Sequence, residues 1–515
     1  MTIFRILFHL LLSIQRRFEF TYKGAYNSNR YLLIKLKEAA MKPRFWHLIV
    51  IVLIVILPML CTHVYREDTT KQKQDTQKEE KVIKKTLPSQ KENVSIGSPD
   101  STFLFPKNFI WGVATSAFQS EGGDGKTDWD AWDKYQKSNP IHPGFTKKDI
   151  VLAHDIGIQE LRFSIEWAKV EPEEGVWDNT ALTHYQNLVR EMQRQNIRPF
   201  LNLHHFTLPQ WLTKKGGLEN DSFPYWYARY AKTIAYAMKP FSIMRWMTFN
   251  EPVVPIETGY LNGDWPPFKS RDIGGAKRAT WNIIRAHKRA YLTIHKTLDT
   301  PGHHVSVGMA YLDHLFVPDD STSKKDQQVV DLLDFGNSMI IRATEDYQDF
   351  IGLNYYNRSV VNFSTATVVF GNIPIAVGYN TNPNGPTTEN GSAIYPRGIY
   401  ELILKYRSFE KPIIIAENGI WDSKDNTRRK FIVNHLRETH RAMQMLAKTK
   451  SPVIGYFYWT LFDNYEWSEL KMTPFGLIAV DPKTLVRTPR SSASLYHDII
   501  RTHGVTPALQ KKYLQ

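Results

Sequence analysis

Residues 160–205, ELRFSIEWAKVEPEEGVWDNTALTHYQNLVREMQRQNIRPFLNLHH, consist of a short apolar segment, a helix-length amphipathic segment and a second apolar segment. The two apolar segments, Glu160–Ile165 and Arg198–His204, have the length and composition of buried strands. Between them, Asn179–Gln195 carries the apolar period of a helix that covers a core with one face. This order is typical of two parallel strands joined by a helix.

The same alternation continues along the chain from Phe105 onward. Further strands are predicted at Ile110–Ser116, Met244–Asn250, Val305–Tyr311, Phe350–Tyr355, Pro412–Glu417 and Val453–Trp459, and further helices at Tyr225–Met238, Lys277–Thr297 and Arg428–Lys448. Eight strands with intervening helices indicate an α/β fold, a (β/α)8 TIM barrel. A doubly wound open sheet has the same alternation, although no glycine-rich phosphate loop follows the first strand, which disfavours nucleotide binding.

Polar and aromatic residues gather where these strands end. They are Arg162, Glu166, His204, His205, Asn250, Glu251, Asn354, Tyr356, Glu417, Asn418 and Trp459. A polar residue at one strand end usually caps a helix or forms a turn. Polar or aromatic residues at six strand ends together indicate a site. A barrel has its active site at this face, where the carboxyl ends of the strands meet.

Charge and cysteine content restrict the possible partners. Residues 1–100 hold 17 Lys and Arg against 9 Asp and Glu, so more than half of the net charge of +14 lies there. No basic and aromatic nucleic-acid motif accompanies this charge, and we expect no nucleic-acid partner. The single cysteine, Cys61, excludes an intramolecular disulfide framework. The 14 Trp, 25 Tyr and 27 Phe suit either a large core or a carbohydrate site.

An almost uninterrupted apolar run, FWHLIVIVLIVILPML, covers Phe45–Leu60. With its flank, residues 45–65 are long enough to cross a bilayer, and we predict a transmembrane signal-anchor helix there. Basic residues precede the run and acidic residues follow it, so residues 1–44 are placed in the cytoplasm and the large domain outside, anchored to the membrane. Alternatively, residues 1–44 are a leader segment. A start at Met41 would give a short basic region followed by the apolar stretch of a signal peptide, and cleavage of that signal would secrete the domain.

The remaining boundaries follow from composition. Residues 66–101 are rich in Lys, Gln, Glu and Thr and poor in apolar side chains, which predicts a flexible, disordered linker. The barrel domain is predicted at residues 102–503, followed by a C-terminal tail at residues 504–515.

Four motifs at the predicted strand ends resemble those of family 1 glycoside hydrolases, which are retaining β-glycosidases of the β-glucosidase and β-galactosidase type. They are FPKNFIWGVATSAFQSEG (Phe105–Gly122), WMTFNEP (Trp246–Pro252), IAENG (Ile415–Gly419) and GYFYWTLFDNYEW (Gly455–Trp467). The resemblance extends from about Phe103 to about His497. Phe206, where many members have Trp, and Glu166 are closer to a bacterial or archaeal branch than to the plant enzymes.

The chemistry of such an enzyme suits the two glutamates in these motifs. Cleavage with retention needs a protonated carboxyl beside the leaving oxygen and an ionised carboxylate that attacks the anomeric carbon, roughly 5–5.5 Å apart. The resemblance assigns these roles to Glu251 as acid/base and Glu417 as nucleophile. It also implies that Arg162 keeps the nucleophile ionised, that Tyr356 orients it by a hydrogen bond, and that Asn250 holds the sugar 2-hydroxyl.

The resemblance also implies a set of substrate-binding residues. They are Gln119, His205, Asn250, Glu466 and Trp467 for the glycone hydroxyls, with Trp459 as the stacking floor. Members that prefer 6-phosphorylated sugars tend to lack an acidic residue at the position of Glu466, so we expect an unphosphorylated glycoside or oligosaccharide. No metal or organic cofactor is implied, and His303 and His304, without partners at ligand spacing, are interpreted as a loop pair.

Several alternatives stay open in the sequence. Transfer of the sugar to an acceptor other than water would use the same glycosyl-enzyme. A catalytically silent, receptor-like carbohydrate-binding domain would typically lack one of the two glutamates, and both are present. The aromatic residues Trp129, Trp132, Phe206 and Trp211 suit an aglycone entrance or core packing equally well. The sequence does not specify the glycone among glucose, galactose, mannose and fucose, the natural aglycone or the oligomeric state.

Overall fold

The computed structural model describes residues 102–138, 140–363, 367–370, 373–376 and 385–514. The predicted signal anchor and the predicted linker lie outside these residues. Within the described part of the chain, no helix combines the length and the apolar character that a membrane span requires. Gly97–Gln515 forms one compact unit.

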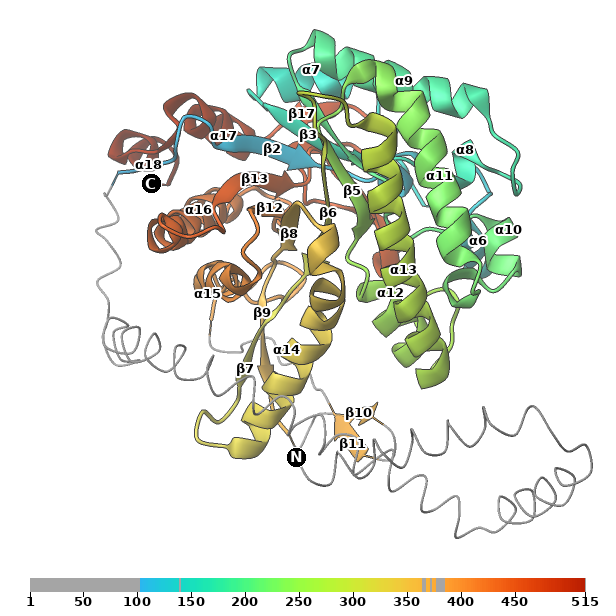
Figure 1. Cartoon of the computed structure of the whole chain (residues 1–515). Coiled ribbons are helices and arrows are strands. Elements are labelled where there is room, and N and C mark those ends of the chain that lie inside the picture. The colour runs from blue at the N-terminus through green and yellow to red at the C-terminus, as the bar shows by residue number, and fades with distance from the viewer. Residues whose placement is uncertain (1–101, 139, 364–366, 371–372, 377–384, 515) are drawn as a thin grey trace, which may run out of the picture. The chain divides into compact units, whose positions relative to one another are not determined.

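Eight parallel strands close into a barrel in the order β12, β13, β2, β3, β4, β5, β6, β8 (Figure 1). Their bounds are Ile110–Ala114 (β2), Glu160–Ser164 (β3), Arg198–Asn202 (β4), Arg245–Asn250 (β5), Ser306–Leu312 (β6), Phe350–Asn354 (β8), Ile413–Asn418 (β12) and Val453–Trp459 (β13). Each of the eight predicted strands is one of these. The predicted barrel is therefore confirmed, and closure excludes the doubly wound open sheet.

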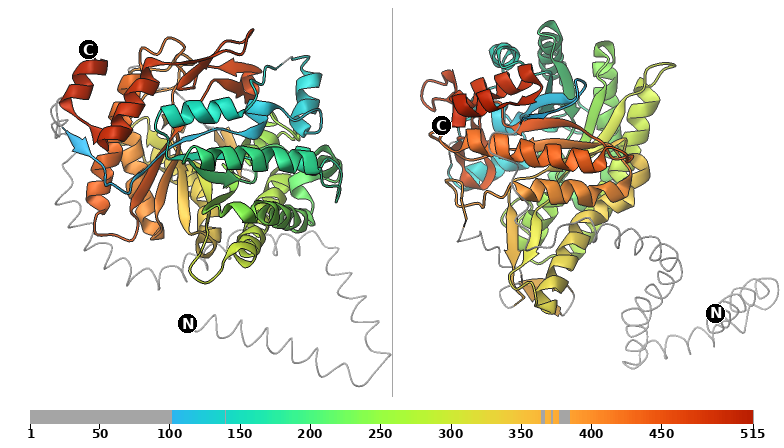
Figure 2. Two further views of the ribbon diagram at one scale, coloured as in Figure 1. Left: turned by 90° about the horizontal axis from the view of Figure 1, so that it is seen from above. Right: turned by 90° about the vertical axis from the view of Figure 1, so that its left-hand side faces the viewer.

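Helices surround this barrel, as Figure 2 shows from two further directions. The longer ones are Lys147–Asp155 (α7), Asn179–Arg194 (α9), Phe223–Met238 (α11), Ile273–Leu298 (α13), Lys324–Thr344 (α14), Arg397–Tyr406 (α15), Arg428–Leu446 (α16) and Ser491–Thr502 (α17). Shorter ones are Ala117–Glu121 (α5), Asp128–Tyr135 (α6), Trp167–Val170 (α8), Gln210–Lys214 (α10) and Val254–Ile256 (α12). The four predicted helices are confirmed as α9, α11, α13 and α16.

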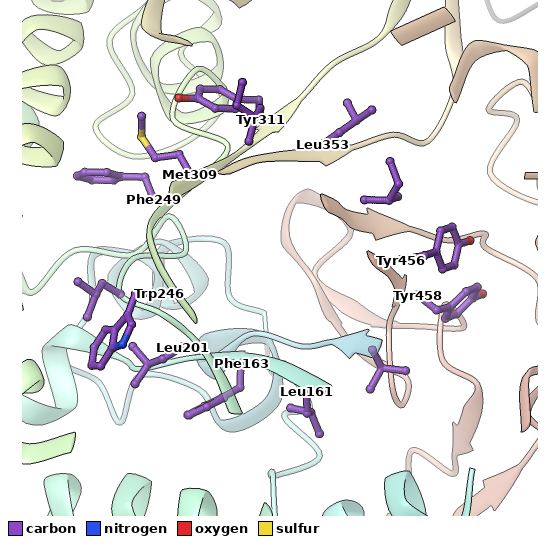
Figure 3. Packing of buried hydrophobic residues seen from close by; sticks show 14 of the residues in the cluster. Leu161, Phe163, Leu201, Trp246, Phe249, Met309, Tyr311, Leu353, Tyr456 and Tyr458 are labelled. Atoms are coloured by element: carbon purple, nitrogen blue, oxygen red, sulfur yellow. The ribbon is translucent and has the colours of Figure 1, made fainter. Parts of the chain in front are cut away.

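The strands separate two cores because successive side chains point to opposite sides of the sheet. Pairs two residues apart, such as Leu161 and Phe163 or Tyr456 and Tyr458, belong to the large outer core between strands and helices (Figure 3). The barrel interior is filled by Ile110, Phe200, Met247, Ala310, Phe350, Ile414, Ala416 and Phe457. A Cβ at Gly112 would lie 2.3 Å from the Phe457 ring, so glycine there leaves room for the interior phenylalanine.

The described residues also form five two-stranded sheets outside the barrel. They pair Phe103–Leu104 (β1) with Gly504–Val505 (β18), Leu315–Pro318 (β7) with Arg358–Val361 (β9), Thr367–Phe370 (β10) with Ile373–Ala376 (β11), Asn464–Glu466 (β14) with Lys471–Thr473 (β15), and Ile478–Val480 (β16) with Arg487–Pro489 (β17).

The packed chain continues past the predicted boundary at residue 503. Strand β18 pairs with β1 at the start of the domain, and helix α18 (Pro507–Leu514) follows it. Tyr513 is buried, and its hydroxyl donates a hydrogen bond of 2.8 Å to Asp498 on α17. The segment predicted as a tail is therefore part of the folded domain through Leu514.

One buried arginine ties the loop after β12 to its surroundings. The Arg428 guanidinium is fully buried and donates to the Tyr458 hydroxyl at 2.9 Å and to the Asp425 carboxylate at 2.6 Å. It also donates to the backbone carbonyls of Asp422 and Pro474, each at 2.6 Å. A buried charge that loses its partner is costly, so this arginine is expected to contribute strongly to stability.

Arg428→Met should lower the free energy of unfolding by about 3–5 kcal/mol, because it leaves the Asp425 carboxylate buried without its cation. Arg441→Met on the same helix is the control, since Arg441 is partly exposed and its pair with Glu438 is worth at most about 1 kcal/mol. Urea denaturation followed by circular dichroism measures both. Equal losses in the two variants would contradict a special role for Arg428.

Candidate active site

The two predicted catalytic glutamates occupy strand ends whose register is irregular. In β5, the pairing with β6 shifts between Met247 and Asn250. Thr248 contacts His287 of helix α13, and Phe249 belongs to the outer core, so two successive side chains face outward. Such a bulge re-aims the residues that follow it. Asn250 consequently points toward the site rather than toward the helices.

Strand β12 has a similar irregularity. Ile413 and Ile415 belong to the outer core and Ala416 to the barrel interior, so strict alternation would turn Glu417 outward. The pairing with β8 shifts between Ile415 and Glu417, and Glu417 instead contacts groups inside the site. Asn418 faces outward, where its amide oxygen accepts from the Tyr456 hydroxyl at 2.7 Å.

Glu251, the residue directly after β5, has an unusual backbone conformation. Its φ is +47°, in the left-handed region that residues with a side chain rarely adopt. Its backbone N–H donates to the Ala310 carbonyl at 2.8 Å, which holds this conformation in place. Such backbone strain is concentrated at functional sites.

A fully buried guanidinium, that of Arg162 on β3, joins the second glutamate to its surroundings. Arg162 Nη1 donates to Glu417 Oε1 at 2.6 Å and to the Ala416 carbonyl at 3.1 Å. Its Nη2 donates to Asn250 Oδ1 at 2.5 Å. The other Glu417 oxygen accepts from the Tyr356 hydroxyl at 2.5 Å. Arg162, Asn250, Glu417 and Tyr356, predicted from the sequence, thus lie together.

Asn354, at the end of β8, completes this network, although its sequence motif predicted no role for it. Its Nδ2 donates to Glu251 Oε1 at 2.7 Å and to Asn250 Oδ1 at 3.0 Å. The two glutamates are thereby connected through Asn354, Asn250 and Arg162. The available signal was its position at a strand end, two residues before Tyr356.

The two carboxyl groups differ in the charges around them. Burial raises the pKa of Glu251 to about 8, and the neighbouring Glu417 carboxylate adds to this rise. Burial also raises the pKa of Glu417, but Arg162 and the Tyr356 hydroxyl oppose that rise. Because one negative charge disfavours a second nearby, the group beside the cation ionises first. At neutral pH the proton is therefore on Glu251 and the charge on Glu417.

Aromatic rings lie beside this network. The His205 ring lies nearly parallel to the rings of Trp459 and Trp467, with centroid distances of 5.8 and 6.0 Å and interplanar angles of 12° in both cases. Its Nε2 lies 3.3 Å from Asn250 Nδ2. Burial lowers the pKa of His205 well below its ordinary value, so the ring is neutral and can accept that hydrogen bond.

Gln119 and Glu466 form a polar pair beside these rings. Gln119 Nε2 donates to the Tyr465 carbonyl at 2.8 Å and lies 3.4 Å from Glu466 Oε2. The amide oxygen of Gln119 accepts a hydrogen bond of 2.7 Å from the Ser116 hydroxyl. Burial and the Glu417 charge raise the pKa of Glu466 to about 8. A protonated carboxyl both donates and accepts hydrogen bonds, so charge repulsion of a sugar phosphate would apply only to its ionised form.

The aromatic residues left open between an aglycone entrance and core packing are packed. Trp129, Trp132 and Phe206 form one buried cluster with Trp265 and Trp467. Trp211 packs against the outer core elsewhere, where its indole N–H donates to the Glu171 carbonyl at 2.9 Å. Trp129 contacts Trp467 edge-on at 4.7 Å, so the cluster supports the ring beside His205.

Among the described residues, no group of three or more His, Cys, Asp or Glu side chains is arranged to hold a metal ion. His304 lies in a loop with His303, and its Nδ1 is 3.3 Å from Asp299.

A closed parallel barrel that holds two carboxyl groups with unlike surroundings at its C-terminal face is the architecture of a glycoside hydrolase. The comparison with protein families agrees with this class. The model described as glycosyl hydrolase family 1 matches residues 101–344 and 336–505, and the chain belongs to that family.

Relatives come from several kingdoms of life. A β-galactosidase of Pyrococcus woesei is 28% identical, with 80% of this chain and 100% of the relative covered. The solved structure of a family 1 β-glucosidase from Thermotoga maritima is 26% identical, with a TM-score of 0.70 and coverage of 79% of this chain and 99% of that one. A galactolipid galactosyltransferase of Arabidopsis thaliana is 28% identical, covering 70% of this chain and 57% of the relative. The predicted bacterial or archaeal likeness is confirmed by the first two.

Glu417→Gln should lower the pKa of Glu251 from about 8, because the amide removes the like charge that disfavours its ionisation. The pKa of Glu466 should fall in the same variant for the same reason. Carbon-13 NMR titration of labelled glutamate carboxyls measures both, with Glu251→Gln and Glu466→Gln for assignment. Glu410→Gln, at an exposed surface pair, should change neither pKa. An unaltered Glu251 pKa would mean that the two carboxyls do not interact.

Proposed function

We propose that this domain hydrolyses terminal β-linked glucosides or galactosides, without a phosphate group, with retention of the anomeric configuration. One observation carries the proposal: Glu417 is held by Arg162 and Tyr356, while Glu251, which forms no ion pair with any residue that the structure describes, holds a proton at neutral pH. This is the division of roles that a retaining mechanism needs.

In the first proposed step, a Glu417 oxygen forms a bond to the anomeric carbon as the bond to the leaving oxygen breaks. Glu251 gives its proton to that oxygen, and the product is a glycosyl ester of Glu417. In the second step, Glu251, now a carboxylate, takes a proton from water. The water oxygen replaces Glu417 at the anomeric carbon and restores both groups.

Substrate recognition would use the groups that surround this pair. Asn250, held by Arg162 and Asn354, is placed to bind the sugar 2-hydroxyl beside the nucleophile. Gln119 and Glu466 offer donors and acceptors to the remaining hydroxyls, and Trp459 offers a ring face to the sugar C–H surface. These groups suit a gluco- or galacto-configured ring.

Transfer to an acceptor other than water is a second candidate activity. The observation in its favour is the name of the plant relative, which is a galactosyltransferase. Both reactions share the glycosyl ester of Glu417, so they differ only in the molecule that enters the second step. Product analysis with and without an added sugar acceptor distinguishes them.

Aryl β-glucoside and β-galactoside should be hydrolysed with the β-anomer of the sugar formed first, as followed by proton NMR. The alkaline limb of kcat/KM against pH should lie near 8, because the free enzyme loses its general acid when Glu251 loses its proton. Glu251→Gln should lower kcat by about 10²–10⁴-fold and remove that limb. Aryl β-mannoside, β-fucoside and 6-phospho-β-galactoside serve as comparison substrates. First formation of the α-anomer would refute retention, and turnover only with an added acceptor would favour transfer.

Glu417→Gly should abolish hydrolysis and keep the fold, since the change removes the nucleophile and leaves a small space. Added azide should restore turnover of an activated aryl glycoside and form the α-glycosyl azide, because azide attacks from the side that Glu417 occupied. The control is azide with Glu251→Gly, where attack from the opposite side should form the β-glycosyl azide. The same azide product from both variants would contradict the assignment of roles.

A further inference from the structure

The positive charge of the barrel domain is concentrated on two neighbouring helices, α11 and α13. Residues 101–515 contain 48 Lys and Arg and 42 Asp and Glu. Of these, the two helices contain eight Lys and Arg and no Asp or Glu, so the rest of that segment has two more acidic than basic residues. The helices pack against each other on one flank of the barrel (Figure 1). The two helices therefore contribute an excess of cations to this flank, part of which is paired with carboxylates of neighbouring segments.

Six exposed residues of α13 form a continuous stripe along one face of the helix. They are Arg278, Trp281, Arg285, Arg289, Leu292 and Lys296, at the three- and four-residue spacing of one helix face. From the first to the last, this stripe is about 27 Å long at the rise of an α-helix. Trp281 and Leu292 are 54% and 56% exposed, so two large apolar side chains lie among the cations.

Helix α11 adds exposed tyrosines to the same flank. Tyr225 is 63% exposed and Tyr236 is 56% exposed, and the exposed Lys232 lies between them with its ammonium 5.7 Å from the Tyr236 ring centroid. The spacing of these three residues, seven and four, places them on one side of the helix. We name the exposed residues of α11 and α13 the basic flank.

Several cations of the basic flank have no acidic partner. Arg278 and Arg285 pair with Glu219 and Asp221 at one end of α13. Lys277, Arg289 and Lys296 are exposed and form no ion pair with any other residue in the described part of the chain. Such a field attracts a surface of opposite charge.

We propose that the basic flank is a docking surface for an anionic phospholipid membrane. Cations interspersed with Trp, Tyr and Leu suit the headgroup level of a bilayer, where the charges meet anionic lipids and the apolar side chains enter the boundary with the acyl chains. A nucleic acid would use the cations but leave Leu292 without a role. A second copy of the same face would be repelled by its own charge.

The docked orientation would leave the active site accessible. Helices α11 and α13 follow β4 and β5 on the outside of the barrel, whereas the glutamates lie at the C-terminal ends of the strands. The membrane would therefore cover a side of the barrel and leave its mouth open.

The domain can be tested without the first part of the chain. The structural match to the Thermotoga maritima β-glucosidase covers 79% of this chain and 99% of that one. A barrel of this family therefore folds without a segment like the first part of this chain. The protein for the test is residues 97–515, which form the compact unit. It would be sedimented with vesicles of phosphatidylcholine alone and of equal parts phosphatidylcholine and phosphatidylserine.

Binding should occur to the phosphatidylserine vesicles, weaken with added salt and be absent with phosphatidylcholine alone. The variant Lys277→Glu/Arg289→Glu/Lys296→Glu should bind at least about tenfold more weakly. Its matched control, Lys147→Glu/Lys424→Glu/Lys483→Glu, reverses three exposed charges elsewhere and should bind at most a few-fold more weakly. Near-ultraviolet circular dichroism and the melting temperature verify that each variant is folded, whatever its glycosidase activity.

The apolar contribution needs its own pair of variants. Trp281→Ala/Leu292→Ala should weaken vesicle binding about tenfold or more, while Tyr135→Ala/Val486→Ala, at two exposed apolar positions elsewhere, should not. Equal binding by both charge variants, or no binding to anionic vesicles, would overturn the proposal. Binding to a single-stranded RNA oligonucleotide that depends on the cations but not on Trp281 and Leu292, without vesicle binding, would assign the flank to nucleic acid instead.

Discussion

The buried guanidinium of Arg162 is the charge on which the arrangement of the active site depends. A cation without exposure to water must be paired, and its partners are the Glu417 carboxylate, the Asn250 amide oxygen and the Ala416 carbonyl. These partners come from β12 and β5, so one side chain from β3 connects three barrel strands. Because Asn250 also accepts from Asn354, which donates to Glu251, the position of each glutamate is coupled to that of the other.

The different protonation of the two glutamates follows from this asymmetric contact. Both are buried, which disfavours the charged form of each, but only Glu417 has a cation and a hydroxyl donor against its oxygens. Burial, and in addition the charge on Glu417, raises the pKa of Glu466. Burial and the charge on Glu417 together keep the neighbouring carboxyls protonated at neutral pH, so the site holds less negative charge than its sequence suggests.

Backbone geometry holds these side chains in place. Glu251 occupies the left-handed region, and Gly419, two residues after the nucleophile, lies so close to the Trp459 carbonyl that a Cβ there would come within 1.9 Å of its oxygen. The glycine of the Ile415–Gly419 motif thus permits β12 to approach the tryptophan on β13. The His205 ring packs nearly parallel to that tryptophan and also to Trp467.

The sequence by itself determined the eight strands, four of the covering helices and the residues of the site, because apolar periodicity and the motifs at strand ends are local properties. It did not determine which way the strand ends point. Strict alternation turns Asn250 and Glu417 toward the helices, and only the bulges in β5 and β12 direct them inward. The role of Asn354, the burial of Trp129 and the basic flank of α11 and α13 were also decided by tertiary structure. Each depends on contacts between segments far apart in the chain, which no local pattern of residues records.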